Sequence, residues 1–170
     1  MNSQQLHWKL VHYDRITPDE LYDAVVLRQR VFVVEQQCAF LEADGIDRYS
    51  WHLFGRLSGD VRHVQSAQSG NALIAYLRIV PPGRRFEEPS IGRVLTAPEV
   101  RRTGVGRVLM QEGIRRTREL FPGQTIKLSA QRYLEKFYGS LGFVVVGEPY
   151  DEDGIPHINM SLFQEGLLAT

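Results

Sequence analysis

The sequence lacks several features that would assign it at once to a common class of protein. It has one cysteine, Cys38, so no disulfide can form within the chain, which favours a reducing compartment. No run of about 18 apolar residues is present to span a membrane, and residues 1–5 lack the basic and apolar layout of a secretory signal. We therefore expect a cytoplasmic protein.

A surplus of charge of either sign is also missing. Lys and Arg together number 20, as do Asp and Glu, so the formal net charge is zero. Binding to nucleic acid or to a membrane surface through bulk charge is therefore not expected. The five histidines show no metal-ligand spacing, and we expect no metal.

The composition is that of a folded protein of ordinary type. Hydrophobic residues make up 43% and charged residues 24% of the 170 residues, close to the average of globular domains. No linker, repeat or low-complexity tract divides the chain, so we expect one domain over residues 1–170. The polar stretch 59–71 is predicted to be a long hairpin tip.

Local patterns predict an α/β fold built on one mixed sheet with helices on its faces. Apolar segments bounded by turn residues predict strands at 6–10, 51–57, 72–80, 90–96, 125–130, 143–147 and 158–163. A capping box predicts a helix start at Thr17, and apolar residues at steps of three and four predict a long helix over 104–121. A short helix is expected at 133–141, and the run 31–34 fits either helix or extended chain.

The most informative segment is the hexapeptide 101–106, Arg-Arg-Thr-Gly-Val-Gly, between a predicted strand and the long helix. Its glycines let the backbone approach a bulky ligand. A helix that begins here directs unpaired N–H groups and a positive dipole end outward, and Arg107 adds charge. We therefore predict a diphosphate site. A P-loop would need a lysine that is missing, and a dinucleotide-binding loop would need glycine at Leu109.

This hexapeptide resembles the phosphate loop of the GCN5-related N-acetyltransferase (GNAT) superfamily, Gln/Arg-x-x-Gly-x-Gly/Ala. A second segment, Phe137–Phe143, matches the family's late-helix motif Phe-Tyr-x-x-Leu-Gly-Phe. Segments 27–36 and 153–158 are similar to the N- and C-terminal signatures of the ElaA-like branch. The resemblance spans nearly the whole chain. It implies the acyl-coenzyme A (CoA) N-acyltransferase fold, a mostly antiparallel mixed sheet of six to seven strands with helices on both faces.

The resemblance also implies a reaction and a co-substrate. The acetyl group of acetyl-CoA would pass to a primary amine by direct attack in a ternary complex, without a metal. The strand 90–96 would pair with the pantetheine arm, diverge from the strand 125–130 and carry a bulge near Leu95 or Thr96. The residues implied to bind the co-substrate are Val94, Leu95, Thr96, Arg101, Arg102, Thr103, Gly104, Val105, Gly106 and Arg107.

Tyr138 stands where the family has a tyrosine that protonates the departing CoA thiolate, and the alternative is a tyrosine that only packs. The general base stays open: Glu35, His157, Glu42 and Glu99 qualify by residue type, and we retain Glu35 or His157 as candidates. Arg93 is a further candidate, either to bind an acidic acceptor or to pair with an acid.

Two other functions fit the same residues. One is a non-catalytic module that binds or senses acyl-CoA. The other is an acyltransferase with a longer acyl donor, because residues 27–35 loosely resemble the acyl-homoserine-lactone synthases. The acceptor is expected to be a small-molecule or peptide amine, which the acidic stretch 148–153 would attract if it were cationic. A homodimer is common in the superfamily.

Overall fold

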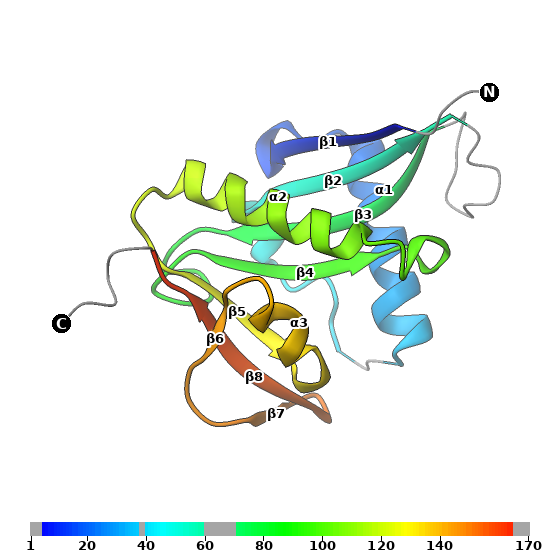
Figure 1. Ribbon diagram of the computed structural model, residues 1–170. Helices are drawn as coiled ribbons and strands as arrows, with labels where there is room; N and C mark the ends of the chain where they lie inside the picture. Colours follow the sequence, from blue (N-terminus) through cyan, green and yellow to red (C-terminus); the bar gives the residue numbers. More distant parts are fainter. Residues whose placement is uncertain (1–4, 38–39, 60–70, 165–170) are drawn as a thin grey trace.

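One eight-stranded sheet organises the chain, of which the computed structural model describes residues 5–37, 40–59 and 71–164. The strand order is β1-β2-β3-β4-β5-β8-β6, and β7 also pairs with β8 (Figure 1). The strands are β1 (Gln5–His12), β2 (Trp51–Ser58), β3 (Asn71–Val80), β4 (Ser90–Thr96), β5 (Ile126–Gln131), β6 (Val144–Val145), β7 (Tyr150–Glu152) and β8 (Ile155–Leu162). Every pairing is antiparallel except that of β4 with β5. The predicted fold class is confirmed, with one strand more than expected.

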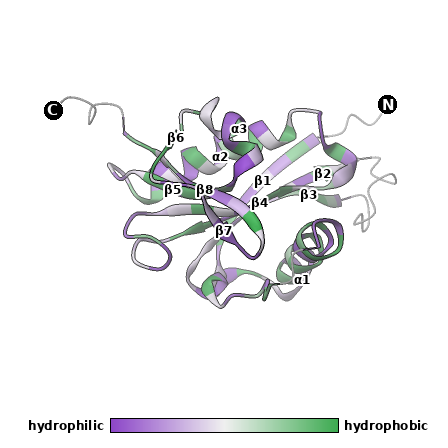
Figure 2. Cartoon of the chain, turned by 90° about the horizontal axis from the view of Figure 1, so that it is seen from below, coloured by the Kyte–Doolittle hydropathy of each residue, from purple (hydrophilic) through white to green (hydrophobic). Residues whose placement is uncertain are grey.

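Helices cover both faces of this sheet. Figure 2 shows α1 (Pro18–Arg28) on one side and α2 (Val105–Leu120) and α3 (Glu135–Gly139) on the other. The capping box of α1 is present as predicted: the Thr17 hydroxyl accepts from the Glu20 amide, and the Glu20 carboxylate accepts from the Thr17 amide. Short 3-10 turns occupy Tyr13–Arg15, Ile46–Tyr49, Pro98–Val100 and Arg132–Leu134.

The ambiguous run 31–34 continues the first helix as a π-helical turn, η2 (Gln29–Glu35). Its wide winding is seen in the bond from the Gln36 amide to the Val31 carbonyl, at 3.0 Å. Such turns recur at functional sites because they re-aim side chains. Here the turn directs Phe32, Glu35 and Gln36 toward the cavity described below.

The face that α2 buries explains why its sequence is helical. The buried residues follow the helical repeat at 109, 110, 113, 114 and 117. A Cβ at Gly113 would lie 2.5 Å from the Leu77 Cδ2 atom, so glycine lets the helix lie close to β3. The long helix therefore anchors its N-terminus, where the predicted phosphate loop is, against the centre of the sheet.

The C-terminal third differs most from the sequence prediction. The segment 150–152, expected as loop, is strand β7, joined to β8 by a two-residue turn with positive φ at Asp153 (54°) and Gly154 (80°). Such paired left-handed residues match the twist of a hairpin. The helix expected at 133–141 is a 3-10 turn followed by α3, and the strand expected at 143–147 is only two residues long.

The sheet splits between β4 and β5. These strands share one pair of partners, Ser90 and Lys127, and diverge beyond it as predicted. The bulge predicted near Leu95 or Thr96 is also present in β4, directly before Leu95. Tyr76 pairs with Leu95 and Arg78 with Gly92, so two residues of β4, 93 and 94, face one residue of β3. The predicted polar tip falls, for residues 60–70, outside the described ranges.

Candidate active site

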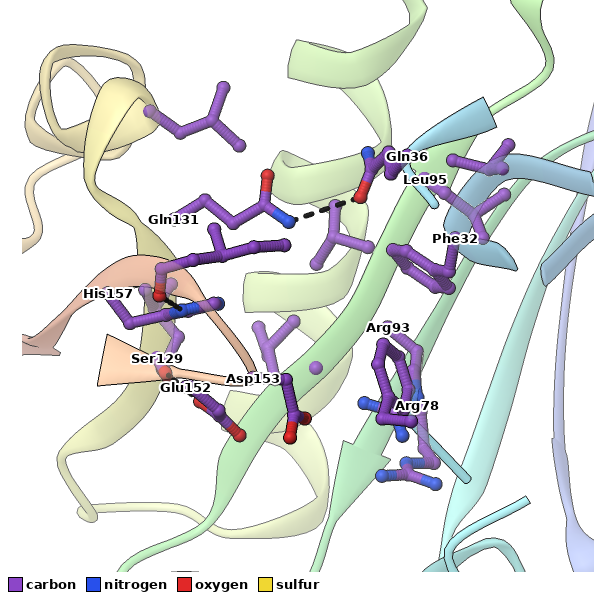
Figure 3. A pocket seen from close by; sticks show the side chains of 18 of the residues that line it. Phe32, Gln36, Arg78, Arg93, Leu95, Ser129, Gln131, Glu152, Asp153 and His157 are labelled. Carbon is purple, nitrogen blue, oxygen red and sulfur yellow. Dashed lines mark hydrogen bonds between the residues drawn. The ribbon is translucent and has the colours of Figure 1, made fainter. Parts of the chain in front are cut away.

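A cavity of about 620 Å³ fills the split between β4 and β5 (Figure 3). One wall is formed by β5 and the β7–β8 hairpin, and the other by β4, η2 and residues 40–46. Of the residues predicted to bind the co-substrate, Val94, Leu95, Thr96 and Arg101 line this cavity. The structure therefore brings the end of β4 and the beginning of the phosphate loop to one place.

The remaining loop residues form the start of α2. Gly104 is the N-cap with φ of 91°, and no side chain caps the helix there. The first amides of an α-helix have no intrahelical partner, so this end can donate to an anion. A Cβ at Gly106 would lie 3.9 Å from the Thr96 Cγ2 atom, which places the helix start beside the end of β4.

Side chains fix the loop in this position. The Thr103 hydroxyl donates to the Val100 carbonyl at 2.6 Å, and Arg107 donates to the Ser140 hydroxyl at 2.6 Å, which links α2 to the end of α3. Arg102 adopts a left-handed φ of 63°. The loop is thus held in shape before any ligand arrives.

Tyr138 lies on α3 and lines the cavity with only 6% of its surface exposed. Its ring packs edge-on against Phe137 and Phe143, with centroid distances of 5.1 and 6.1 Å. Among the described residues, its hydroxyl has no hydrogen-bond partner. Burial raises the pKa of the Tyr138 phenol, with a smaller contribution from Tyr133, so the group keeps its proton at neutral pH. Tyr138 is therefore a buried, protonated phenol in the cavity lining.

Glu35 is held by Arg101, the first residue of the predicted phosphate loop. Its carboxylate accepts two hydrogen bonds from Arg101, at 2.5 and 2.9 Å, across the cavity mouth. The hydrogen bond to Glu35 raises the pKa of the Arg101 guanidinium. The two side chains are therefore engaged with each other.

His157 lies on β8 and points into the cavity (Figure 3). Its Nδ1 lies 2.8 Å from the Ile155 carbonyl oxygen. Because a carbonyl only accepts, Nδ1 carries the proton and Nε2 keeps a lone pair. The ring lies 6.0 Å from that of Tyr150. In the neutral imidazole, this contact thus favours the tautomer in which Nε2 carries no proton.

Beside His157, Glu152 is held as a carboxylate. Burial opposes its ionisation, but hydrogen bonding and charge from Arg85 lower its pKa below the usual value. Arg85 donates to it at 3.0 Å, and the Ser129 hydroxyl donates at 3.2 Å. This carboxylate is already neutralised by its guanidinium partner.

The two other candidate bases lie outside the cavity lining. Glu42 is buried between Arg28 and Arg93, at 2.7 and 2.9 Å, and Glu99 pairs with Arg30 at 2.8 Å. Of the alternatives for Arg93, the structure shows pairing with acids.

The sequence pattern did not reveal a buried ionic network behind this wall. Its members are the guanidinium groups of Arg28, Arg78 and Arg93 and the carboxylates of Glu42, Asp44 and Asp47. Tyr76 and His52 extend it, because the His52 Nδ1 lies 2.7 Å from the Tyr76 hydroxyl. The only signal was an arginine inside the otherwise apolar segment 72–80, which predicts a buried partner without saying which.

Within the described ranges, no helix is long and apolar enough to cross a membrane. Nor do three or more His, Cys, Asp or Glu residues of these ranges gather as a metal site would require.

Comparison with known proteins agrees with this geometry. The model of the acetyltransferase (GNAT) domain matches residues 54–163. Protein ElaA of Escherichia coli is 36% identical over 156 residues, covering 92% of this chain and 95% of ElaA. A UPF0039 protein of Synechocystis sp. is 40% identical over 156 residues, covering 92% and 94%.

Solved structures with the same architecture are also similar in sequence. The crystal structure of an acyl-CoA N-acyltransferase from Pseudomonas aeruginosa superposes with a TM-score of 0.81 at 38% identity, covering 92% of this chain and 99% of that one. The crystal structure of E. coli ElaA gives a TM-score of 0.79 at 33% identity, with the same coverage.

Proposed function

This chain belongs to the GNAT acetyltransferase family, and from this premise we propose that it transfers the acetyl group of acetyl-CoA to a primary amine. The observation that carries the proposal is the buried Tyr138, which lines the cavity and whose hydroxyl has no partner among the described residues. A protein that only bound acyl-CoA would have no need of a proton donor there. The acceptor is a small-molecule or peptide amine.

Binding would use the backbone more than side chains. The pyrophosphate would lie at the N-terminus of α2, where Gly104 leaves the first amides uncapped. The pantetheine arm would enter the split beside Val94–Thr96, as an added strand does. A backbone N–H near Leu95 would then polarise the thioester carbonyl and stabilise the oxyanion that forms on it.

The reaction needs two proton transfers. The neutral amine attacks the thioester carbon, a C–N bond forms, and collapse of the tetrahedral intermediate breaks the C–S bond. Tyr138 gives its proton to the departing thiolate. We assign the general base to His157 Nε2, which has a free lone pair, since Glu35 is paired with Arg101. No covalent acyl-enzyme is needed, because positioning of two reactants supplies much of the rate.

The test is release of free CoA from acetyl-CoA with a panel of amines, together with Tyr138→Phe. We expect turnover by the native chain and a loss of about 10²–10⁴-fold in kcat for Tyr138→Phe, the usual contribution of a positioned acid. Tyr22→Phe, on the exposed side of α1, is the matched control and should not alter kcat.

Three outcomes are informative. Saturable binding of acetyl-CoA without thiol release for any amine would favour the non-catalytic module. Faster turnover of hexanoyl- than of acetyl-CoA would favour the longer donor. An unchanged kcat in Tyr138→Phe would show that Tyr138 only packs and does not donate a proton.

A further inference from the structure

Arg93 reaches the cavity only because β4 is bulged. Its neighbour Gly92 pairs with Arg78, whose side chain lies on the cavity face of the sheet. Successive side chains of a regular strand point to opposite faces, so Arg93 would otherwise point toward α2. The bulge gives it a left-handed φ of 52°, an uncommon and strained conformation for a non-glycine residue. Strain of this kind is often kept where a side chain must be aimed at a ligand.

The Arg93 guanidinium is hydrogen-bonded to two acidic residues but keeps N–H donors that have no partner among the described residues. Its Nε and Nη2 donate to Glu42 at 2.9 and 3.2 Å, and Nη2 also donates to Asp44 at 3.2 Å. The rings of Phe40 and Phe32 lie 5.1 and 5.9 Å from its central carbon. Nη1, with two N–H groups, bonds to no described residue. Two donors therefore remain at a rigid guanidinium that lines the cavity.

Two further polar groups at the same end of the cavity lack partners. Arg78 and Ser90 are both 1% exposed and line the cavity, at the end where β4 and β5 meet. The Arg78 Nε and the Ser90 Oγ atoms have no hydrogen-bond partner among the described residues. Buried polar groups are nearly always paired, so an orphaned pair beside a ligand cavity indicates that an oxygen-rich group completes them.

The opposite wall has the complementary charge. Asp153 lies at the β7–β8 turn, lines the cavity and makes no ion pair within the described residues (Figure 3). Glu152 beside it is already paired with Arg85. One free carboxylate therefore faces the cavity from the wall that also carries His157.

We infer that the acceptor is a free amino acid, whose carboxylate binds Arg93 Nη1 and whose ammonium group approaches along the Asp153 and His157 wall before it loses a proton. The inference rests on the proposed function. Arg93 and Leu95 lie two residues apart in the bulged part of β4, and both line the cavity. An amine attached one carbon away from a carboxylate at Arg93 would then lie on the same wall as the proposed site of the thioester carbonyl. Simple amines and polyamines offer nothing to the guanidinium.

The test compares matched acceptors in the native chain. Each of the twenty amino acids is assayed beside its amide and its decarboxylated amine, with acetyl-CoA and thiol release as the readout. We expect at least one amino acid to exceed both of its counterparts that lack the carboxylate by tenfold or more in kcat/KM. If amides and decarboxylated amines react as well or better, the inference fails and the proposed function stands. If no acceptor of any kind reacts, both fail.

The variant Arg93→Lys tests whether the Arg93 side chain causes the preference for acceptors with a carboxylate. Lysine keeps the charge but not the planar fork that fixes the free donors, so the preference for the carboxylate should fall at least tenfold. Arg84→Lys is the matched control, because Arg84 stacks on Tyr49 outside the cavity lining. Thermal unfolding checks that each variant is folded. An unchanged preference in folded Arg93→Lys would contradict the assignment, and the panel with the native chain does not depend on either variant.

Discussion

The ion pair between Glu35 and Arg101 affects how strongly the cavity can bind a pyrophosphate. Both were candidates from the sequence, one as a base and the other as a phosphate ligand, yet they face each other at 2.5 Å. A pyrophosphate that approached Arg101 would compete with Glu35 for the same donors. The ion pair is nearly two-fifths exposed on each side, so it is weak enough to be exchanged.

Glu35→Gln should therefore bind CoA more tightly. Exposed pairs contribute about 0.2–1 kcal/mol, so we expect an affinity gain of up to about fivefold by calorimetry. Because His157 is assigned as the base, kcat should change little. Glu119→Gln, which removes an exposed carboxylate near the far end of α2, is the control and should alter neither quantity. A loss of about 10²-fold or more in kcat for Glu35→Gln alone would transfer the role of base to Glu35.

Whole elements were predictable where the pattern was long and local. The α2 helix, with a repeated apolar stripe and Pro122 beyond its end, was predicted to within a residue at each end, and β4 exactly in its bounds. The short strand β7 was missed because three residues carry no periodicity, and because it forms only by pairing with β8. The bulge in β4 lies near Leu95 as predicted, but the two residues that form it, 93 and 94, are fixed only by the register with β3.

The backbone conformation at the start of α2 can be tested by a substitution at Gly104. Gly104 has φ of 91°, and a Cβ there would meet nothing within 4 Å, so Gly104→Ala tests backbone conformation alone. We expect a loss of about 1 kcal/mol in unfolding free energy, measured with urea.

Gly83→Ala is the matched control for that variant. Gly83 has φ of 77° and equally open surroundings, but it lies outside the cavity lining. Both variants should lose similar stability, whereas only Gly104→Ala should weaken CoA binding. Equal CoA affinity in the two variants would argue against the helix start as the phosphate site.

At the scale of the whole molecule, the buried network ties distant segments to the wall of the cavity. It joins residues 28, 42–47, 78 and 93, which lie on α1, a loop and two strands. Apart from Arg78 inside the apolar segment 72–80, no local pattern indicated these pairings, because each of the other charges alone resembles an ordinary surface residue. The part of the sequence prediction that is confirmed is therefore the fold, while the phosphate loop stays a prediction. The partners of Glu35, Arg93 and Glu42 depended on how the chain folds in space.

Asp44 makes the stability that this network contributes dependent on pH. Burial would raise its pKa, but the hydrogen bonds and charge of Arg78, with Arg93, lower it from 3.8 to about 2. A lowered pKa contributes stability above the unfolded value, and this is lost as the pH falls from about 4 toward 2. Asp44→Asn should therefore cost about 2 kcal/mol of unfolding free energy at pH 7.

Denaturant titration across pH checks this expectation. The difference between Asp44→Asn and the native chain should shrink as the pH approaches 2, because the native carboxylate is then protonated. Glu87→Gln, an exposed carboxylate, is the control and should differ by less than about 0.5 kcal/mol throughout. A difference for Asp44→Asn that stays constant down to pH 2 would contradict the role of its charge.

The most direct measurement is a calorimetric titration with CoA, with pantetheine, which lacks the pyrophosphate, and with CoA on Arg102→Glu at low salt. We expect one CoA per chain, at least 100-fold weaker binding of pantetheine, and at least tenfold weaker binding of CoA by the variant, because screening is small under those conditions. Absence of saturation with CoA, or equal binding of CoA and pantetheine, would contradict a pyrophosphate site at the start of α2.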